Sequence, residues 1–357
     1  MKMTFRWFGE KSDPIPLAYI RQIPGCTGLM GVLDHYAAGE VWDEDEIRDY
    51  VRLVNAAGLE VKVIESVNVH EEIKLGSPER DRYIDNYIMT VRRLAGHGVD
   101  TIIYNFMPVF DWLRTDLNRR IPEDGSFSMY YDEAELAGLT PQQLAVRTNG
   151  SANGYSLPGW EPERLEQLNQ ILDRYRGFTV DDLRGSLRYF LDAVCPVCEE
   201  LGVRLAIHPD DPAWPLFGLP RLARSGDDLN RILALHDSPA NAVCFCTGSL
   251  GSDPANDLPA IAAELGKKNR IACAHIRNLK YLGYHRFREC SHLSADGSLD
   301  LFGVLAALHD TCPDVTIRPD HGRAIWGEKG RPGYGLYDRA LGIAYINGIW
   351  EALSRKD

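Results

Sequence analysis

The sequence of 357 residues has no apolar run close to the roughly 20 residues that a membrane-spanning helix requires. Its first ten residues, from Met1 to Glu10, lack the apolar core of a secretory signal peptide. Eight cysteines in a chain of this size without a secretion signal indicate reduced thiols and no disulfide framework. We therefore expect a cytoplasmic protein with no membrane partner.

Basic residues are in deficit, with 39 Lys and Arg against 51 Asp and Glu and a formal net charge of −12. A nucleic-acid-binding protein would present a basic stripe, so no nucleic-acid partner is expected. A small anionic ligand remains compatible with this charge, because a site can be locally positive inside an acidic protein.

Sequence motifs for nucleotides and for structural zinc are also missing. Neither GxGxxG after a predicted strand nor GxxxxGK[ST] occurs. The pair Cys195-Pro-Val-Cys198 has no second CxxC and lies in a helical pattern. We interpret these two cysteines as small apolar side chains on one face of a helix.

What the chain does contain is an alternation of short apolar runs with helical patterns. Eight β-type runs are Thr4–Phe8, Gly28–Val32, Glu60–Glu65, Thr101–Asn105, Arg204–His208, Ala242–Cys246, Ile271–Ile276 and Val315–Asp320. Most are near-continuous apolar stretches, as parallel strands buried on both faces require. Helical patterns are Asp43–Ala57, Glu79–Gly98, Thr179–Gly202, Asp227–Leu235, Pro254–Leu265, Asp300–Asp310 and Gly335–Ser354. This alternation predicts an α/β protein, a single (β/α)8 TIM barrel over residues 1–357.

One segment, residues 108–178, interrupts the repeat. It follows the fourth predicted strand, is rich in Trp, Tyr, Pro, Asp and Arg, and has weak β character. Long insertions of this kind usually serve as lids or oligomer contacts. We expect Asp111, Trp112 and Arg114 to lie near the barrel mouth, and we expect a homo-oligomer.

Four consecutive predicted strands end on residue types that bind metals. They are His208, Cys246, His275 and Asp320, at the ends of the fifth to eighth strands. The carboxyl ends of barrel strands converge on one mouth, so these side chains should meet there. Side-chain alternation places Ala206, Cys244 and Cys273 in the layer below them.

Each of these residues has a simpler interpretation when it is taken alone. A strand-end histidine is more often structural, a cysteine in an apolar strand is usually core, and an aspartate before glycine often forms a turn. Their equivalent positions on neighbouring strands favour a shared cation. Nitrogen, sulfur and oxygen donors disfavour Mg²⁺ and Ca²⁺ and leave Zn²⁺, Fe²⁺, Mn²⁺ and Co²⁺ open. Arg318 would point inward beneath Asp320, either paired with Glu65 or displaced by a bend at Pro319.

The segment after the eighth strand offers groups for proton transfer. His321 can exchange a proton near neutral pH, and Tyr334, flanked by glycines, can approach a ligand closely. Their alternatives are a rim histidine bonded to a carbonyl and an aromatic ring packed on the barrel. Further candidate clamps for a carboxylate or hydroxyl are Arg277, Asn278, Lys280 and Arg323, with solvated rim charges as the alternative.

Several stretches resemble the D-mannonate dehydratase family, and together they span nearly the whole chain. They are Val41-Trp42, Tyr104 to Trp112, Ile207 to Pro212, Cys246 to Gly251, His275 to Asn278, Arg318 to Arg323 and Arg331 to Asp338. The resemblance implies a barrel related to xylose-isomerase-like enzymes, a requirement for Mn²⁺ or Fe²⁺, and dehydration of D-mannonate to 2-keto-3-deoxy-D-gluconate. It places the metal ligands on the four strand-end residues. It places the proton-transfer pair on His321 and Tyr334, with Tyr337 as an alternative, and makes Asn105 a candidate substrate contact.

The reaction implied is a metal-assisted β-elimination. A divalent ion on the substrate carboxylate and 2-hydroxyl would stabilise the enediolate that forms when C2 loses its proton. One of Tyr334 and His321 would take this proton and the other would protonate the departing 3-hydroxyl; we favour Tyr334 as base, with its pKa lowered by the metal or a nearby arginine.

Three other functions fit parts of the same pattern. A metal-dependent sugar isomerase or epimerase on this barrel would release no water. A zinc endonuclease would need a basic groove, which the net charge opposes. A non-catalytic sugar-acid-binding protein would not need both proton-transfer groups.

Overall fold

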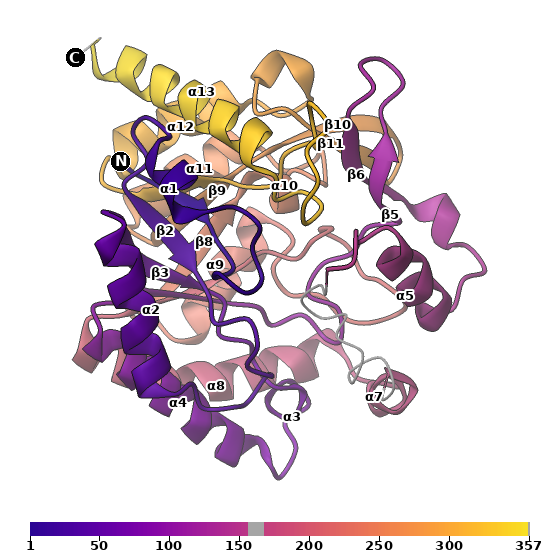
Figure 1. The fold of residues 1–357 in the computed structure, drawn as a ribbon. Coiled ribbons are helices and arrows are strands. Elements are labelled where there is room, and N and C mark those ends of the chain that lie inside the picture. Colours follow the sequence, from indigo (N-terminus) through magenta and orange to yellow (C-terminus); the bar gives the residue numbers. More distant parts are fainter. Residues whose placement is uncertain (156–167, 356–357) are drawn as a thin grey trace.

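Eight parallel strands close into a barrel in the computed structural model of the chain, which describes residues 1–155 and 168–355 (Figure 1). The spatial order is β1 (Lys2–Arg6), β12 (Thr316–Pro319), β9 (Ile271–Ile276), β8 (Asn241–Cys246), β7 (Arg204–Ile207), β4 (Thr101–Tyr104), β3 (Glu60–Glu65) and β2 (Gly28–Gly31), which pairs again with β1. The eight predicted strands are confirmed, with ends that differ by at most two residues. The chain therefore has the predicted TIM-barrel architecture.

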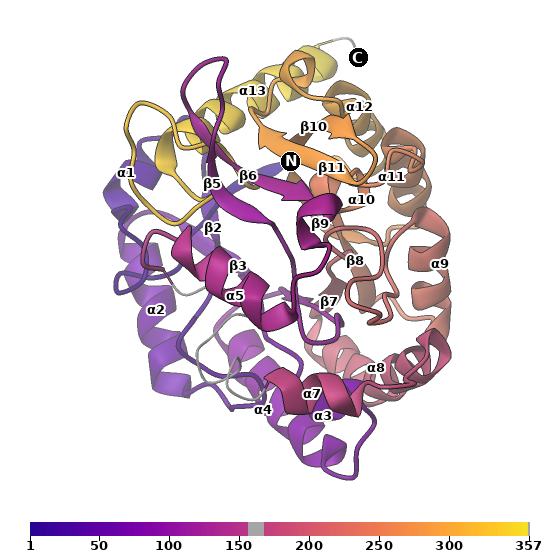
Figure 2. The same ribbon diagram turned by 90° about the vertical axis from the view of Figure 1, so that its right-hand side faces the viewer.

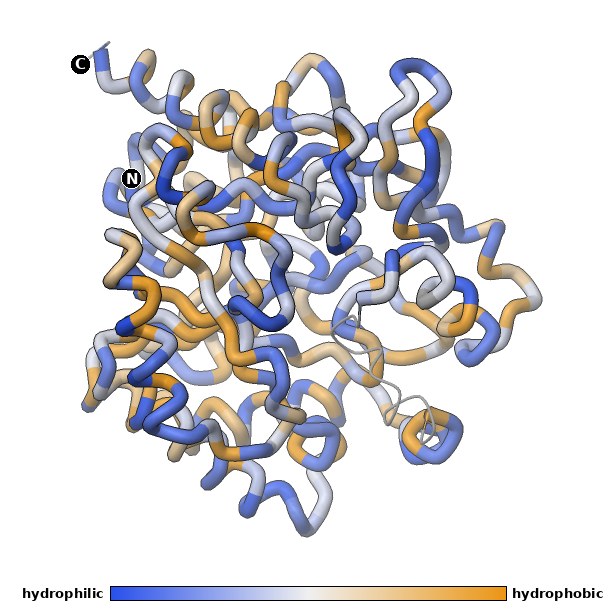
Figure 3. The backbone as a smooth tube through the Cα atoms, viewed as in Figure 1, coloured by the Kyte–Doolittle hydropathy of each residue, from blue (hydrophilic) through white to orange (hydrophobic). Residues whose placement is uncertain are grey.

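Helices surround the barrel, as Figure 2 shows. They are α1 (Leu17–Arg21), α2 (Glu44–Ala56), α3 (Glu71–Lys74), α4 (Arg80–Gly96), α8 (Val180–Leu201), α9 (Gly226–Leu235), α10 (Thr247–Leu250), α11 (Leu258–Lys267), α12 (Leu301–Thr311) and α13 (Leu336–Ser354). In Figure 3, hydrophobic and hydrophilic residues are interspersed along α2 and α4, and the buried ones, such as Ile47, Tyr50 and Val54 of α2, recur at the spacing of one helix face. No helix of the described residues is long and apolar enough to cross a membrane.

Helix α8 shows how local sequence sets an element's limits. The Thr179 hydroxyl accepts a hydrogen bond from the Asp182 amide, and the Asp182 carboxylate accepts one from the Thr179 amide, a capping box. At the other end Gly202 adopts φ of 67°, a left-handed conformation that suits glycine. Cys195 and Cys198 are buried on this helix and unpaired, which confirms their interpretation as apolar helix-face residues.

The barrel interior below the mouth is a layer of apolar side chains. Its members are Met30, Val63, Ile103, Ala206, Cys244 and Cys273, so the predicted placement of the last three is confirmed. Inward-pointing positions repeat every second residue along a strand. His208, Cys246 and His275 therefore belong to the next layer, at the carboxyl ends of their strands.

A second, antiparallel sheet lies at the end of the barrel where the carboxyl ends of its strands meet (Figures 1 and 2). Its order is β10 (Asn278–Gly283), β11 (Arg286–Cys290), β6 (Phe127–Asp132) and β5 (Asp116–Arg120). The predicted insertion thus contributes two strands despite its weak β character. The β10–β11 hairpin, which follows the seventh barrel strand, was not predicted, because it is completed by pairing with a distant segment, such as Phe287 with Tyr131.

The rest of the insertion is helical where it is described. It contains the 3-10 helix η1 (Glu133–Leu136) and the helices α5 (Pro141–Gly150) and α7 (Leu168–Arg174). Residues 156–167, which belong to the predicted 108–178 insertion, lie outside the described residues.

Candidate active site

A cavity of about 570 Å³, counting the solvent space at its mouth, opens at the carboxyl ends of the barrel strands. This place is typical of a small-molecule site on a TIM barrel. Its walls are formed by Arg6, Phe8, Glu65, Ser66, Ile103, Asn105, Asp111, Trp112, His208, Asp211, Arg277, Arg318, Asp320, His321 and Tyr334. Six of the site residues predicted from the sequence line this cavity, namely Asn105, His208, Arg277, Asp320, His321 and Tyr334. Asp111 and Trp112 of the insertion also reach the cavity, as expected.

The four predicted metal ligands come together at this mouth. The ligand atoms of Cys246, His275 and Asp320 all lie within 4.8 Å of one another, and these side chains are fully buried. A second group with the same spacing joins His208 and His275 to Cys244. His275 belongs to both groups, so the choice between the two cysteines decides where an ion would lie.

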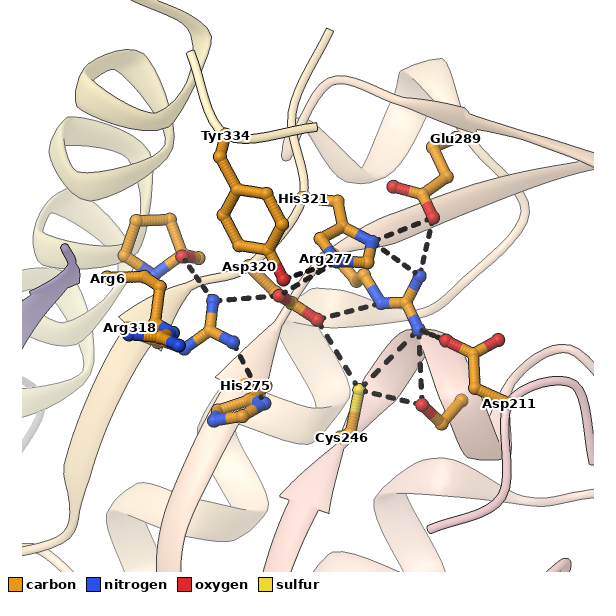
Figure 4. A network of polar contacts seen from close by, with 12 residues as sticks. Arg6, Asp211, Cys246, His275, Arg277, Glu289, Arg318, Asp320, His321 and Tyr334 are labelled. Atoms are coloured by element: carbon orange, nitrogen blue, oxygen red, sulfur yellow. Dashed lines mark hydrogen bonds and ion pairs between the residues drawn. The ribbon is translucent and has the colours of Figure 1, made fainter. Parts of the chain in front are cut away.

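Charge distinguishes the two cysteines. Burial raises the pKa of the Cys246 thiol, but the Arg277 guanidinium, together with hydrogen bonds to His208 and His275, brings this pKa well below its usual value. Burial raises the pKa of Cys244 well above its usual value, and neighbouring Cys273 raises it further. Only Cys246 therefore has the character of a thiolate, the form that binds metals. Its Sγ lies 3.6 Å from Oδ2 of Asp320, and a shared cation would offset the repulsion between two anions (Figure 4).

His208 has the outer contact that metal-bound histidines usually make, whereas His275 has an arginine at its Nδ1. Nδ1 of His208 lies 2.8 Å from the Pro209 carbonyl oxygen and donates to it, which leaves the lone pair on Nε2. Nδ1 of His275 accepts from Arg318 Nη2 at 3.3 Å. Its buried Nε2 has no hydrogen-bond partner and lies 3.5 Å from Glu65 Oε2. The nitrogen, sulfur and oxygen donors present fit a divalent transition metal.

Arg318 holds the carboxylates next to this cluster. Its Nε and Nη2 donate to the two Glu65 oxygens at 3.0 and 2.8 Å, so the predicted pairing is confirmed. Its Nη1 donates to Oδ1 of Asp320 at 2.7 Å. Burial raises the pKa of Glu65, but Arg318 and His275 lower it to about 2. Both carboxylates are consequently fixed as anions beside the metal-binding group.

His321 and Tyr334 form a hydrogen-bonded pair above the same residues. The distance between His321 Nε2 and Tyr334 Oη is 2.9 Å, and Nε2 lies 3.7 Å from Asp320 Oδ1. On the other side of the ring, Nδ1 lies 2.9 Å from Glu289 Oε1 (Figure 4). Burial raises the Glu289 pKa, but His321 and Arg277 lower it to about 2, so the carboxylate accepts and Nδ1 donates. Tyr334 then donates its proton to the lone pair of Nε2.

The favoured role of Tyr334 as base required a lowered pKa. Burial instead raises the pKa of the Tyr334 phenol well above its usual value, and Asp320 raises it further. In this arrangement the proton is on the tyrosine and the lone pair on His321. Tyr337, the alternative tyrosine, is exposed on α13 with its ring centroid 5.6 Å from that of Trp326, and it does not line the cavity.

The predicted substrate clamps differ in their positions. Arg277 lines the cavity, but its guanidinium already pairs with protein carboxylates, including Asp320 at 2.9 Å from Nε. Asn278, Lys280 and Arg323 are not among the lining residues. The buried Asn278 amide bonds to main-chain groups after β11, and Arg323 pairs with Asp338 at 3.0 Å.

A buried ionic network behind His321 was not predicted. Arg114 of the insertion donates from Nη1 to Asp211 Oδ1 at 2.8 Å and from Nη2 to Glu289 Oε1 at 2.7 Å. Arg277 donates to the same two carboxylates, at 2.6 Å to Glu289 Oε1. Asp211 lies in the Ile207 to Pro212 stretch, three residues after His208, and its place in this family-like stretch was the one sequence feature that could have indicated it. Glu289 lies on the hairpin that the sequence did not reveal.

The family of the chain follows from comparison with known proteins. The family model described as D-mannonate dehydratase (UxuA) matches residues 1–357. The chain belongs to this family. A curated mannonate dehydratase of Lachnoclostridium phytofermentans is 64% identical over 355 residues, covering 99% of both chains, and one of Thermotoga maritima is 53% identical, covering 99% of this chain and 98% of its own. The chain is therefore a hydro-lyase, as the resemblance implied.

Solved structures agree with this assignment. The crystal structure of mannonate dehydratase from Streptococcus suis serotype 2 superimposes with a TM-score of 0.90 at 41% identity, covering 100% of this chain and 95% of that chain. A structure of L-ribulose 3-epimerase gives a TM-score of 0.54 at 11% identity, covering 100% and 97%. The second likeness shows a shared barrel fold and carries no information on the reaction.

Proposed function

We propose that the cavity binds D-mannonate and removes water from it to give 2-keto-3-deoxy-D-gluconate. The observation that carries this proposal is the His321–Tyr334 pair, joined at 2.9 Å, directly beside the buried Cys246, His275 and Asp320 cluster. A β-elimination needs one group to take a proton and another to protonate the leaving hydroxyl, next to a centre that stabilises negative charge. These requirements meet at one mouth of the barrel.

We propose that His208, Cys246, His275 and Asp320 hold a Mn²⁺ or Fe²⁺ ion. When bound, such an ion supplies Lewis-acid stabilisation of the negative charge that develops on the sugar acid. Cys246 is proposed as the thiolate ligand because Arg277 stabilises its charge, whereas Cys244 belongs to the apolar layer below.

The chain's own residues carry the protons. In our proposal the lone pair of His321 Nε2 takes the proton from C2, and the Tyr334 hydroxyl protonates the departing 3-hydroxyl. This assignment is supported by the hydrogen-bond partners of the imidazole, because Nδ1 lies against the Glu289 carboxylate, which can only accept, and Nε2 lies against the Tyr334 hydroxyl. Loss of the C2 proton and gain of one by the leaving group balance, so one water molecule is released.

Substrate contacts and water exclusion are assigned to the cavity walls. Asn105 and Arg6 offer polar groups to the cavity, and Asp111 and Trp112 bring the insertion to the mouth. We propose that the insertion covers the bound sugar acid and that the enzyme works as a homo-oligomer in the cytoplasm. The eight free cysteines are consistent with a reducing compartment.

A metal-replacement assay tests the proposed function. The chelator-stripped enzyme should make no keto acid from D-mannonate, and Mn²⁺ or Fe²⁺ should restore production of the 2-keto-3-deoxy acid. Other aldonates, tested in parallel, report substrate strictness, and Mg²⁺ is the control ion because it suits a thiolate ligand poorly. An epimerised or isomerised product without loss of water, or full activity after metal removal, would contradict the proposal.

A further inference from the structure

The most unusual group behind the cavity is the carboxylate of Glu289, on β11 of the antiparallel sheet. This carboxylate is fully buried. One of its oxygens, Oε1, accepts hydrogen bonds from two guanidinium groups and one imidazole: Arg114 at 2.7 Å, Arg277 at 2.6 Å and His321 at 2.9 Å. A buried carboxylate is costly unless paired in this way. Its position on a hairpin outside the barrel repeat sets it apart from the strand-end residues.

We propose that Glu289 is a positioning residue that fixes the tautomer of His321. Its carboxylate can only accept hydrogen bonds, so Nδ1 of His321 carries a proton, and the neutral ring then presents the lone pair of Nε2 to the cavity. The inference rests on the catalytic role proposed for His321, and it assigns the group that prepares that residue for proton transfer.

The contacts of His321 Nδ1 include a second possible partner, Arg277. Nη1 of Arg277 lies 3.2 Å from His321 Nδ1, which by itself would suggest that the ring nitrogen accepts from the guanidinium. Two acceptors 2.9 Å apart would repel, however, and Glu289 Oε1 stands at that distance from Nδ1. Arg277 and His321 are close because both donate to the same oxygen.

The insertion contributes to this arrangement through Arg114. Its guanidinium is fully buried, donates to Glu289 and forms a two-bond pair with Asp211, at 2.8 and 3.1 Å. Such paired contacts hold both groups in one orientation. The proposal therefore links a segment outside the barrel repeat to the orientation of His321.

Kinetics of Glu289→Gln test the proposal. We expect kcat to fall roughly 10- to 100-fold, the usual cost of losing a group that orients a site residue, with KM and metal content nearly unchanged. The matched control is Glu133→Gln, because Glu133, directly after β6, pairs with His285 in the turn between β10 and β11, and neither residue lines the cavity. The control should retain full activity. An unchanged kcat for Glu289→Gln would overturn the proposal.

A double-mutant cycle separates positioning from general structural support. In a His321→Asn background, Glu289→Gln should change kcat by no more than about twofold, because the imidazole that Glu289 orients is already absent. A full additional loss would show that Glu289 acts independently of His321 and would contradict the inference.

A measurement on the unaltered enzyme covers the case of a variant that fails to fold. Nitrogen-15 NMR, with the His321→Asn spectrum used for assignment, should show His321 protonated on Nδ1 and unprotonated on Nε2. The opposite tautomer would overturn the role of Glu289, whether or not the enzyme dehydrates mannonate. Absence of the keto-acid product, with the expected tautomer present, would instead count against the proposed function.

Discussion

Cys246→Ser is expected to reduce bound metal to a small fraction of one ion per chain and to lower kcat by roughly 10³-fold or more, since Lewis-acid stabilisation contributes several kcal/mol. A serine hydroxyl does not ionise near neutral pH, so the anionic ligand disappears. Arg277 would also lose one of the negative charges that it faces. Elemental analysis and keto-acid formation, measured on the same preparation, check this result.

The control for this variant lies two residues earlier on the same strand. Cys244→Ala removes a buried sulfur from the apolar layer, where no charge stabilises a thiolate. We expect lower thermal stability but full metal content and nearly full activity. If Cys244→Ala lost the metal and Cys246→Ser kept it, the ion would belong to the other group of residues, with His208 and His275.

Tyr334→Phe and His321→Asn are each expected to lower kcat by roughly 10²- to 10⁴-fold while the metal stays bound, because each removes one partner of the proton-transfer pair. The two variants should differ in deuterated water. Tyr334→Phe should still exchange the C2 proton of mannonate with solvent, since the lone pair of His321 remains, whereas His321→Asn should not. NMR of recovered substrate measures this exchange.

Tyr337→Phe provides the matched control, because Tyr337 is the neighbouring tyrosine that the sequence left as an alternative and the structure places on the exposed face of α13. It should behave as the unaltered enzyme. Exchange at C2 in His321→Asn but not in Tyr334→Phe would reverse the assignment of base and acid.

Residues at equivalent positions of successive barrel strands could be predicted from the sequence. The eight apolar runs, the layer of Ala206, Cys244 and Cys273, and the convergence of His208 and Asp320 all follow from period-two alternation and the parallel order of the strands. The pairing of Arg318 with Glu65 was one of two alternatives that the sequence left open, and the structure shows this pairing.

Residues on the second sheet could not be predicted in the same way. Glu289 and Arg114 lie 175 positions apart in the sequence, and only the pairing of β11 with β6 brings their segments together. The same applies to Asn278, which resembled a substrate clamp but bonds to main-chain groups inside the protein. Local composition carries no information about which distant segment completes a sheet.

The amino-acid sequence by itself therefore determined the barrel and the four side chains at the ends of its last strands, because both depend on a repeating local pattern. Only the tertiary structure decided which tyrosine meets His321, which cysteine is charged and which carboxylate orients the imidazole. These properties depend on burial and on charges from distant segments, and such contacts exist only after the chain has folded.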